Sequence, residues 1–187
     1  MVVLKKILDF YINSSLHVAL SAFALVFMTQ YFFGVEEDFS VAFFAFFGTV
    51  IGYNFVKYDA IARLNKTEIK KELKAIVFLS FISLLACFYF FLQLSWMSKL
   101  SAVAFLGLTL LYTLPFFPNK QNARNWKGVK IYIVGITWVG VTVILPLVEA
   151  EIPFSIDVFL MAFQRFLLVF SIVLVFDIVD VKHDDIH

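Results

Sequence analysis

The stretch IDVFLMAFQRFLLVFSIVLVFDIVDVKHDDIH, residues 156–187, decides the class of fold. Residues 156–177 are almost entirely apolar, and a helix of about 20 such residues spans the ~30 Å hydrocarbon core of a bilayer. The stretch then runs into four carboxylates, at Asp177, Asp180, Asp184 and Asp185. We therefore predict a membrane-spanning helix that ends in an acidic segment.

The composition of the whole chain supports a membrane protein. Of its 187 residues, 62% are hydrophobic and only 16% are charged, and the mean hydropathy is +0.92. These values lie far outside the range of soluble globular proteins. The single cysteine, Cys87, lies in an apolar run and excludes an intramolecular disulfide. The apolar stretch after Lys5 and Lys6 is too long for a signal peptide, so we interpret it as a retained first helix.

Six hydrophobic segments are each near the length needed to cross a bilayer. Short polar loops separate them, without a flexible linker or a soluble domain. The prediction is a single domain, residues 1–187, with an all-α fold: a polytopic transmembrane helix bundle. The six segments lie at 13–33, 39–57, 75–94, 98–117, 130–148 and 156–177.

The charges of the loops predict the topology. Thirteen of the fifteen Lys and Arg residues fall in the termini and in alternate loops, and the other loops are mainly acidic. By the positive-inside rule the basic side is cytoplasmic, so we expect both termini in the cytoplasm. The thirteen are Lys5, Lys6, Lys57, Arg63, Lys66, Lys70, Lys71, Lys74, Lys120, Arg124, Lys127, Lys130 and Lys182.

The acidic segment predicts a binding site for a divalent cation. On a helix, positions 177, 180 and 184 fall within an arc of roughly 60°. Three like charges on one face repel one another unless a cation lies among them, and the negative end of the helix dipole adds to this repulsion. Carboxylate oxygens suit Mg²⁺, particularly together with a phosphate. The alternative is an acidic helix end solvated by water.

A second polar group follows the second apolar segment, in GTVIGYNFVKYDAIAR, residues 48–63. Asn54, Lys57 and Tyr58 share one helical face at spacings i, i+3 and i+4, and Asp59 follows directly. All four residues lie where the chain leaves the membrane. The alternative to a binding role is that Lys57 and Tyr58 extend toward the interface, as these residue types do in many membrane helices.

These two stretches resemble the UbiA-type intramembrane prenyltransferase superfamily. The second acidic motif of that family, D-x-x-D-x-x-x-D, matches DIVDVKHD with Asp177, Asp180 and Asp184 in register. The first motif, approximately N-D-x-x-D-x-x-x-D, begins at Asn54. The chain then departs from it, because Phe55, Tyr58 and Ala62 stand where the family has acids.

A third stretch, LYTLPFFPNKQNARNWKGVK at 111–130, is similar to the tyrosine and basic residues that follow the fourth helix in the family. The closest matches are Tyr112, Lys120 and Arg124. The family fold has nine transmembrane helices, whereas this chain reaches six and ends just after its second acidic motif. The resemblance therefore implies a UbiA-like bundle that lacks the last three helices, as a fragment or as a naturally shortened relative.

The resemblance also implies a function. Mg²⁺ held by Asp177, Asp180 and Asp184 would neutralise the diphosphate that leaves an isoprenyl diphosphate. The isoprenyl group would pass to an aromatic or other lipophilic acceptor. The alternative is a catalytically inactive UbiA-like scaffold or lipid-binding protein. We expect the lipid bilayer as a partner and no nucleic acid. The substrate-binding residues implied are Asn54, Lys57, Asp59, Tyr112, Lys120 and Arg124.

Polar residues inside the apolar segments remain. Arg165 lies near the middle of the sixth segment, where a charge facing lipid is costly, so it must face protein or water. We expect its partner on another helix, and a structural pair and a substrate contact both remain open. A further polar group, Asn13, Ser14, Ser15 and His17, is predicted to cap the start of the first segment at the membrane interface.

Overall fold

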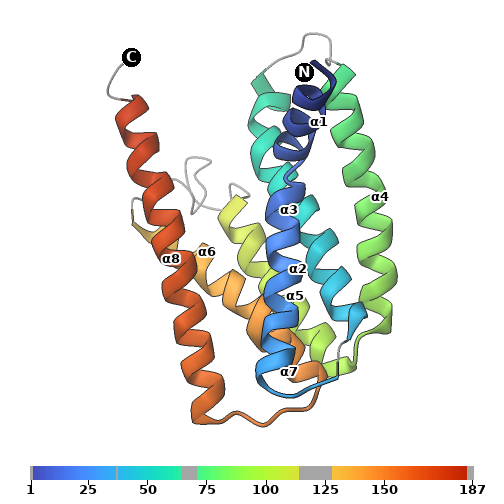
Figure 1. Cartoon of the computed structure of the whole chain (residues 1–187), viewed down its shortest axis with the longest axis vertical. Coiled ribbons are helices and arrows are strands. Elements are labelled where there is room, and N and C mark those ends of the chain that lie inside the picture. The colour runs from blue at the N-terminus through green and yellow to red at the C-terminus, as the bar shows by residue number, and fades with distance from the viewer. Residues whose placement is uncertain (1, 37, 65–70, 114–127, 185–187) are drawn as a thin grey trace. The chain divides into compact units, whose positions relative to one another are not determined.

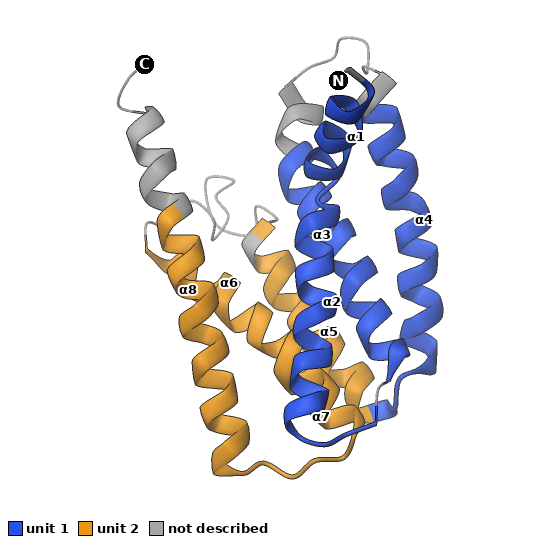
Figure 2. Ribbon diagram, in the orientation of Figure 1, with its two compact units in different colours: residues 1–96 blue, residues 97–187 orange. Residues whose placement is uncertain are grey.

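A computed structural model describes residues 2–36, 38–64, 71–113 and 128–184, and all regular structure in these ranges is helical (Figure 1). The chain divides into two compact units, residues 1–96 and 97–187 (Figure 2). Each unit is a set of helices with its own internal packing. The all-α class predicted from the sequence is confirmed.

Within the described residues, four stretches are long and apolar enough to cross a membrane, as expected of an integral membrane protein. A bent pair of helices near the N-terminus raises the number to five if the pair counts as one span. The sequence predicts six spans. The difference lies at 98–117, where Trp96–Leu111 is an apolar helix shorter than the usual span. The four stretches are Phe39–Tyr58, Leu73–Gln93, Val129–Glu149 and Ile156–Val175.

The first unit contains α1 (Val2–Asn13), α2 (Leu16–Phe32), α3 (Phe39–Leu64) and α4 (Lys71–Gln93). Helix α3 packs against both α2 and α4. Aromatic rings join α3 to both neighbours: the Phe43 ring lies 5.3 Å from Phe23 of α2 and is stacked on Phe90 of α4 at 5.2 Å, both between ring centroids. Small apolar residues are also buried on α2 and α3, and such residues let helix backbones approach closely. The small buried residues are Ala19, Ala22 and Val26 of α2 and Val41, Ala42, Ala45 and Val50 of α3.

Helix α1 was not predicted as a separate element. Lys5 and Lys6 do not precede the first helix, because both lie within α1. The chain bends by 60° between α1 and α2. Ser15 forms this bend with a left-handed backbone, at φ 60°, which few residues other than Gly and Asn adopt readily. The predicted polar cap at residues 13–17 is therefore the joint between two helices.

The second unit contains α5 (Trp96–Thr113), α6 (Val129–Val139), the π-helix η3 (Gly140–Ile144), α7 (Leu145–Glu149) and α8 (Ile156–Asp184). Helices α6, η3 and α7 together make one span, Val129–Glu149, and α6 packs along α8. Pro146 explains the π-helix that precedes it. Proline has no N–H and its ring clashes with the carbonyl four residues before it, so the helix widens there.

Candidate functional site

The acidic segment lies at the end of one continuous helix. Helix α8 extends through Asp184, so Asp177, Asp180 and Asp184 all have helical backbone. Asp185 lies outside the described residues, and the structure gives the first three as backbone positions only. Among the residues with described side chains, no three His, Cys, Asp or Glu residues are grouped as a metal site. The predicted Mg²⁺ site lies on the last part of α8, where the structure does not describe side chains.

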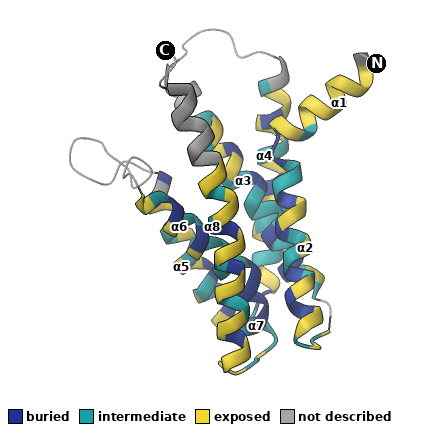
Figure 3. Cartoon of the chain, turned by 60° about the vertical axis from the view of Figure 1, so that its left-hand side comes forward, coloured by how far each residue is buried: buried dark blue, intermediate teal, exposed yellow. Residues whose placement is uncertain are grey.

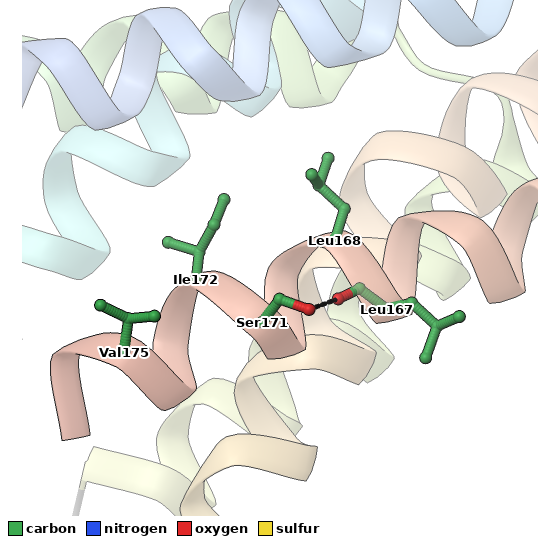
Figure 4. A pocket seen from close by; sticks show the side chains of 5 residues that line it. All are labelled: Leu167, Leu168, Ser171, Ile172 and Val175. Carbon is green, nitrogen blue, oxygen red and sulfur yellow. Dashed lines mark hydrogen bonds between the residues drawn. The ribbon is translucent and has the colours of Figure 1, made fainter. Parts of the chain in front are cut away.

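An exposed apolar face precedes the acidic segment on the same helix. Figure 4 shows the five side chains of α8 that form it, Leu167, Leu168, Ser171, Ile172 and Val175. The four aliphatic ones are 46–60% exposed. The one hydroxyl among the five, on Ser171, donates a hydrogen bond to the carbonyl of Leu167 at 2.8 Å. This face is therefore almost purely apolar, and its last residue, Val175, is two residues before Asp177.

Asn54 is the predicted site residue with the most informative surroundings. Its side chain is 3% exposed, and its Nδ2 donates to Ser80 Oγ of α4 at 3.0 Å. The Ser80 hydroxyl in turn donates to the carbonyl of Ile76 at 2.9 Å. Within the described residues, Asn54 Oδ1 has no hydrogen-bond partner. A buried acceptor without a partner is costly, and an amide oxygen is also a ligand that Mg²⁺ accepts.

Lys57 and Tyr58 contact the joint between α1 and α2. The Tyr58 hydroxyl donates to the backbone carbonyl of Asn13 at 2.8 Å. The ammonium group of Lys57 lies 3.3 Å from the same carbonyl and 3.4 Å from Asn13 Oδ1. Helix α1 ends at Asn13, so this carbonyl has no partner within its own helix, and a lysine often binds such a group. The polar face predicted for α3 therefore divides between α4, which Asn54 contacts, and the joint.

The structure describes the remaining predicted site residues in less detail. Asp59 lies on α3 and Tyr112 on α5, and for both the structure gives the helix but not the side chain. Lys120 and Arg124 fall outside the described residues. Asn54, Lys57 and Asp59 belong to the first unit, whereas Tyr112 and the three aspartates belong to the second. The structure thus describes the two halves of the predicted site separately.

Arg165 has a partner that the sequence did not identify. Its side chain is 3% exposed, and Nη1 donates to Thr142 Oγ1 at 3.2 Å. Thr142 is fully buried in η3, and its hydroxyl donates to the carbonyl of Trp138 at 2.7 Å. The prediction that the partner comes from another helix is confirmed. Thr142 gave no signal in the sequence, because a threonine within an apolar run is common in membrane helices.

Comparison of the chain with models of protein families, with curated proteins and with solved structures gives no match. The functional assignment therefore depends on the chemistry of the residues themselves.

Proposed function

We propose that this chain is an integral membrane prenyltransferase-like protein that binds an isoprenyl diphosphate with Mg²⁺ and serves transfer of the isoprenyl group to a lipophilic acceptor. The observation that carries the proposal is the arrangement of α8. Acids at positions 177, 180 and 184 stay on one uninterrupted helix, and an exposed apolar face directly precedes them. An isoprenyl diphosphate also joins an apolar part to a charged part. Its isoprenyl chain matches the apolar face of α8, and its diphosphate, with Mg²⁺, matches the acidic end.

Each residue set has a defined role in this proposal. Asp177, Asp180 and Asp184 would supply the oxygen ligands for Mg²⁺, which would neutralise charge on the leaving diphosphate. Leu168, Ile172 and Val175 would bind the proximal part of the isoprenyl chain by apolar contact. Asn54 of the first unit remains a proposed substrate contact, and its Oδ1 has no hydrogen-bond partner among the described residues. Tyr112, Lys120 and Arg124 remain proposed diphosphate contacts.

A second candidate function is a lipid-binding or scaffolding protein without catalysis. The observation that favours it is the use of Lys57 and Tyr58, which bind the Asn13 carbonyl. These residues stand in the region of the first acidic motif, where a transferase of the family would bind metal. A lysine held beside a structural carbonyl indicates that this region stabilises the helix joint.

Coupled ligand binding distinguishes the two functions. The purified full chain in detergent is heated with Mg²⁺ alone, with farnesyl diphosphate alone, and with both. A site for the metal-diphosphate pair predicts a gain of about 2–3 kcal/mol at a hundredfold excess over Kd only when both are present. Asp180→Ala should abolish that gain. Mg²⁺ and the diphosphate bind together because each cancels the charge that the other leaves uncompensated.

Asp157→Ala is the matched control, because Asp157 is an exposed acid in the first turn of the same helix. This substitution should leave the stabilisation by Mg²⁺ with farnesyl diphosphate unchanged. A stability that does not respond to the ligand pair would favour the lipid-binding function. In that case Asp180→Ala should be neutral or slightly stabilising, because it removes repulsion at a helix C-terminus.

A further inference from the structure

Helix α1 is amphipathic, with a polar face and an apolar face. In helical projection, Lys5, Lys6, Asp9 and Asn13 fall within an arc of about 100°. The opposite side is apolar and includes a phenylalanine and aliphatic residues. Figure 3 shows that most of α1 is exposed. The exposed apolar residues are Val3, Leu4, Ile7, Leu8, Phe10 and Ile12, with Val3 and Leu4 more than 70% exposed.

The joint fixes the direction of α1. The left-handed Ser15 turns the chain by 60° from the axis of α2. Ser14 and Ser15 are buried, and the terminal carbonyl of α1 is bound by Tyr58 and Lys57 from α3. Helix α1 is thus not a straight extension of the apolar span that follows it.

The same contacts fix the depth of α1. The apolar span of α3 ends at Tyr58. Tyrosine and lysine at the end of a membrane helix mark the interface between hydrocarbon and headgroups. Because these two residues bind Asn13, the C-terminal end of α1 lies at that interface. A helix of 12 residues that leaves this point at 60° to the axis of α2 stays close to the membrane surface along its length.

We infer that α1 is an interfacial anchor: its apolar face binds the boundary between headgroups and acyl chains, and Lys5 and Lys6 bind anionic headgroups. A helix with a charged face, an apolar face and low overall hydrophobicity adopts this position on lipid. The two lysines complement anionic lipid, which attracts basic residues close to the membrane surface. The occupant of the exposed face is therefore lipid. This inference is independent of the proposed transferase function.

A fluorescence scan of the full chain tests the inference. Cysteines are placed singly at Leu4, Ile7 and Leu8 and at Lys6 and Asp9, in a Cys87→Ala background, and labelled with the environment-sensitive dye NBD. The protein is reconstituted in vesicles of phosphatidylcholine with 30% phosphatidylglycerol, a test composition of about one anionic lipid in three. The three apolar positions should be quenched by lipid with a nitroxide at acyl carbon 5 at least about twofold more than the two polar positions. Unchanged thermal unfolding of each labelled protein shows that the label has not displaced the helix.

Three outcomes would overturn the inference. Equal and weak quenching at all five positions would place α1 in water. Protection from aqueous quencher without quenching by the nitroxide lipid would mean that protein, such as a second copy of the chain, covers the face. Strong quenching of both faces by a nitroxide at carbon 12 would make α1 part of a transmembrane span.

A second variant tests the role of charge separately. Lys5→Gln with Lys6→Gln, labelled at Ile7, should lose the increase in quenching that phosphatidylglycerol produces in the parent. Helix formation does not depend on this change, since glutamine and lysine have similar helix propensity. If the parent is quenched equally with and without anionic lipid, the proposed contact of Lys5 and Lys6 with anionic headgroups is wrong.

Discussion

At the scale of single residues, Arg165 and Thr142 show how the fold accommodates a charge within a membrane span. An arginine near the bilayer centre costs about 2.5–3.5 kcal/mol on insertion scales, and a buried one needs acceptors. Thr142 is one partner of Arg165, which also has other interactions. The threonine hydroxyl accepts from the guanidinium and donates to Trp138, so it joins the charge to the backbone that leads into η3.

Thr142→Val should lower the free energy of unfolding by about 1–3 kcal/mol, because it removes a buried acceptor from a charged donor and leaves the volume of the side chain nearly unchanged. Thermal or denaturant unfolding in detergent measures the loss. Thr142→Ser keeps the hydroxyl and should recover most of the stability.

Thr137→Val is the control for a threonine whose hydroxyl donates to its own helix. Its Oγ1 bonds to the carbonyl of Ile133 at 2.9 Å, on the same α6 span. The cost there should be smaller, since a hydroxyl that bonds only its own helix adds little stability. If the two valine variants lose equal stability, the contact between Thr142 and Arg165 contributes no specific stabilisation.

At the scale of elements, the ring of Phe105 on α5 lies against Gly140 of the π-helix. A Cβ atom added at Gly140 would overlap the ring of Phe105 on α5. At Gly135 an added Cβ would lie 2.8 Å from the ring of Phe166 on α8, which is also too close. Glycines at these two positions therefore allow the flanking helices to approach the span, as small residues do in membrane bundles.

Gly140→Ala should destabilise the protein by about 1–3 kcal/mol, because the Phe105 ring or the backbone of η3 must move. Gly107 of α5 has open space around its Cα, and Gly107→Ala should be neutral or stabilising by up to about 1 kcal/mol through helix propensity. The two variants add the same methyl group, so unfolding in the same detergent isolates the effect of packing. A loss that is similar at both positions would contradict the close contact.

The long elements could be predicted well from the sequence and the short ones poorly. Runs of about 20 apolar residues identify spans because the bilayer sets their length. Helix α1 has 12 residues and an amphipathic pattern, so Lys5 and Lys6 resemble the basic flank of a span. The π-helix depends on how Pro146 and Phe105 are accommodated, which no local pattern records. For the candidate site, motif spacing predicts roles for Asn54 and the aspartates that stay predictions, and it gives no sign of the contact between Asn54 and Ser80.

At the scale of the whole molecule, α5 determines the topology. It has 18 residues, so its length is about 27 Å, slightly less than the hydrocarbon core. A mismatch of a few ångströms costs only fractions of a kcal/mol per ångström, because the bilayer can thin locally. If α5 crosses, the loops 33–38 and 150–155 lie on one side of the membrane. If it does not cross, these two loops lie on opposite sides.

We expect α5 to cross, since otherwise Lys120, Arg124 and Lys127 would lie across the membrane from Lys66 and Lys70, against the positive-inside rule. Single cysteines at Glu36, Phe154, Lys70 and Arg124, in a Cys87→Ala background, test this in intact cells with a reagent that does not cross membranes. Glu36 and Phe154 are exposed loop positions, so they should react equally well when they face the reagent. Both should be labelled from outside, and Lys70 and Arg124 only after permeabilisation. Labelling of Glu36 and Arg124 from outside, with Phe154 and Lys70 protected, would mean that α5 stays within one leaflet. That pattern would also place the end of α8, with Asp177, Asp180 and Asp184, on the opposite side of the membrane from Asn54 and so exclude a single diphosphate site built from both.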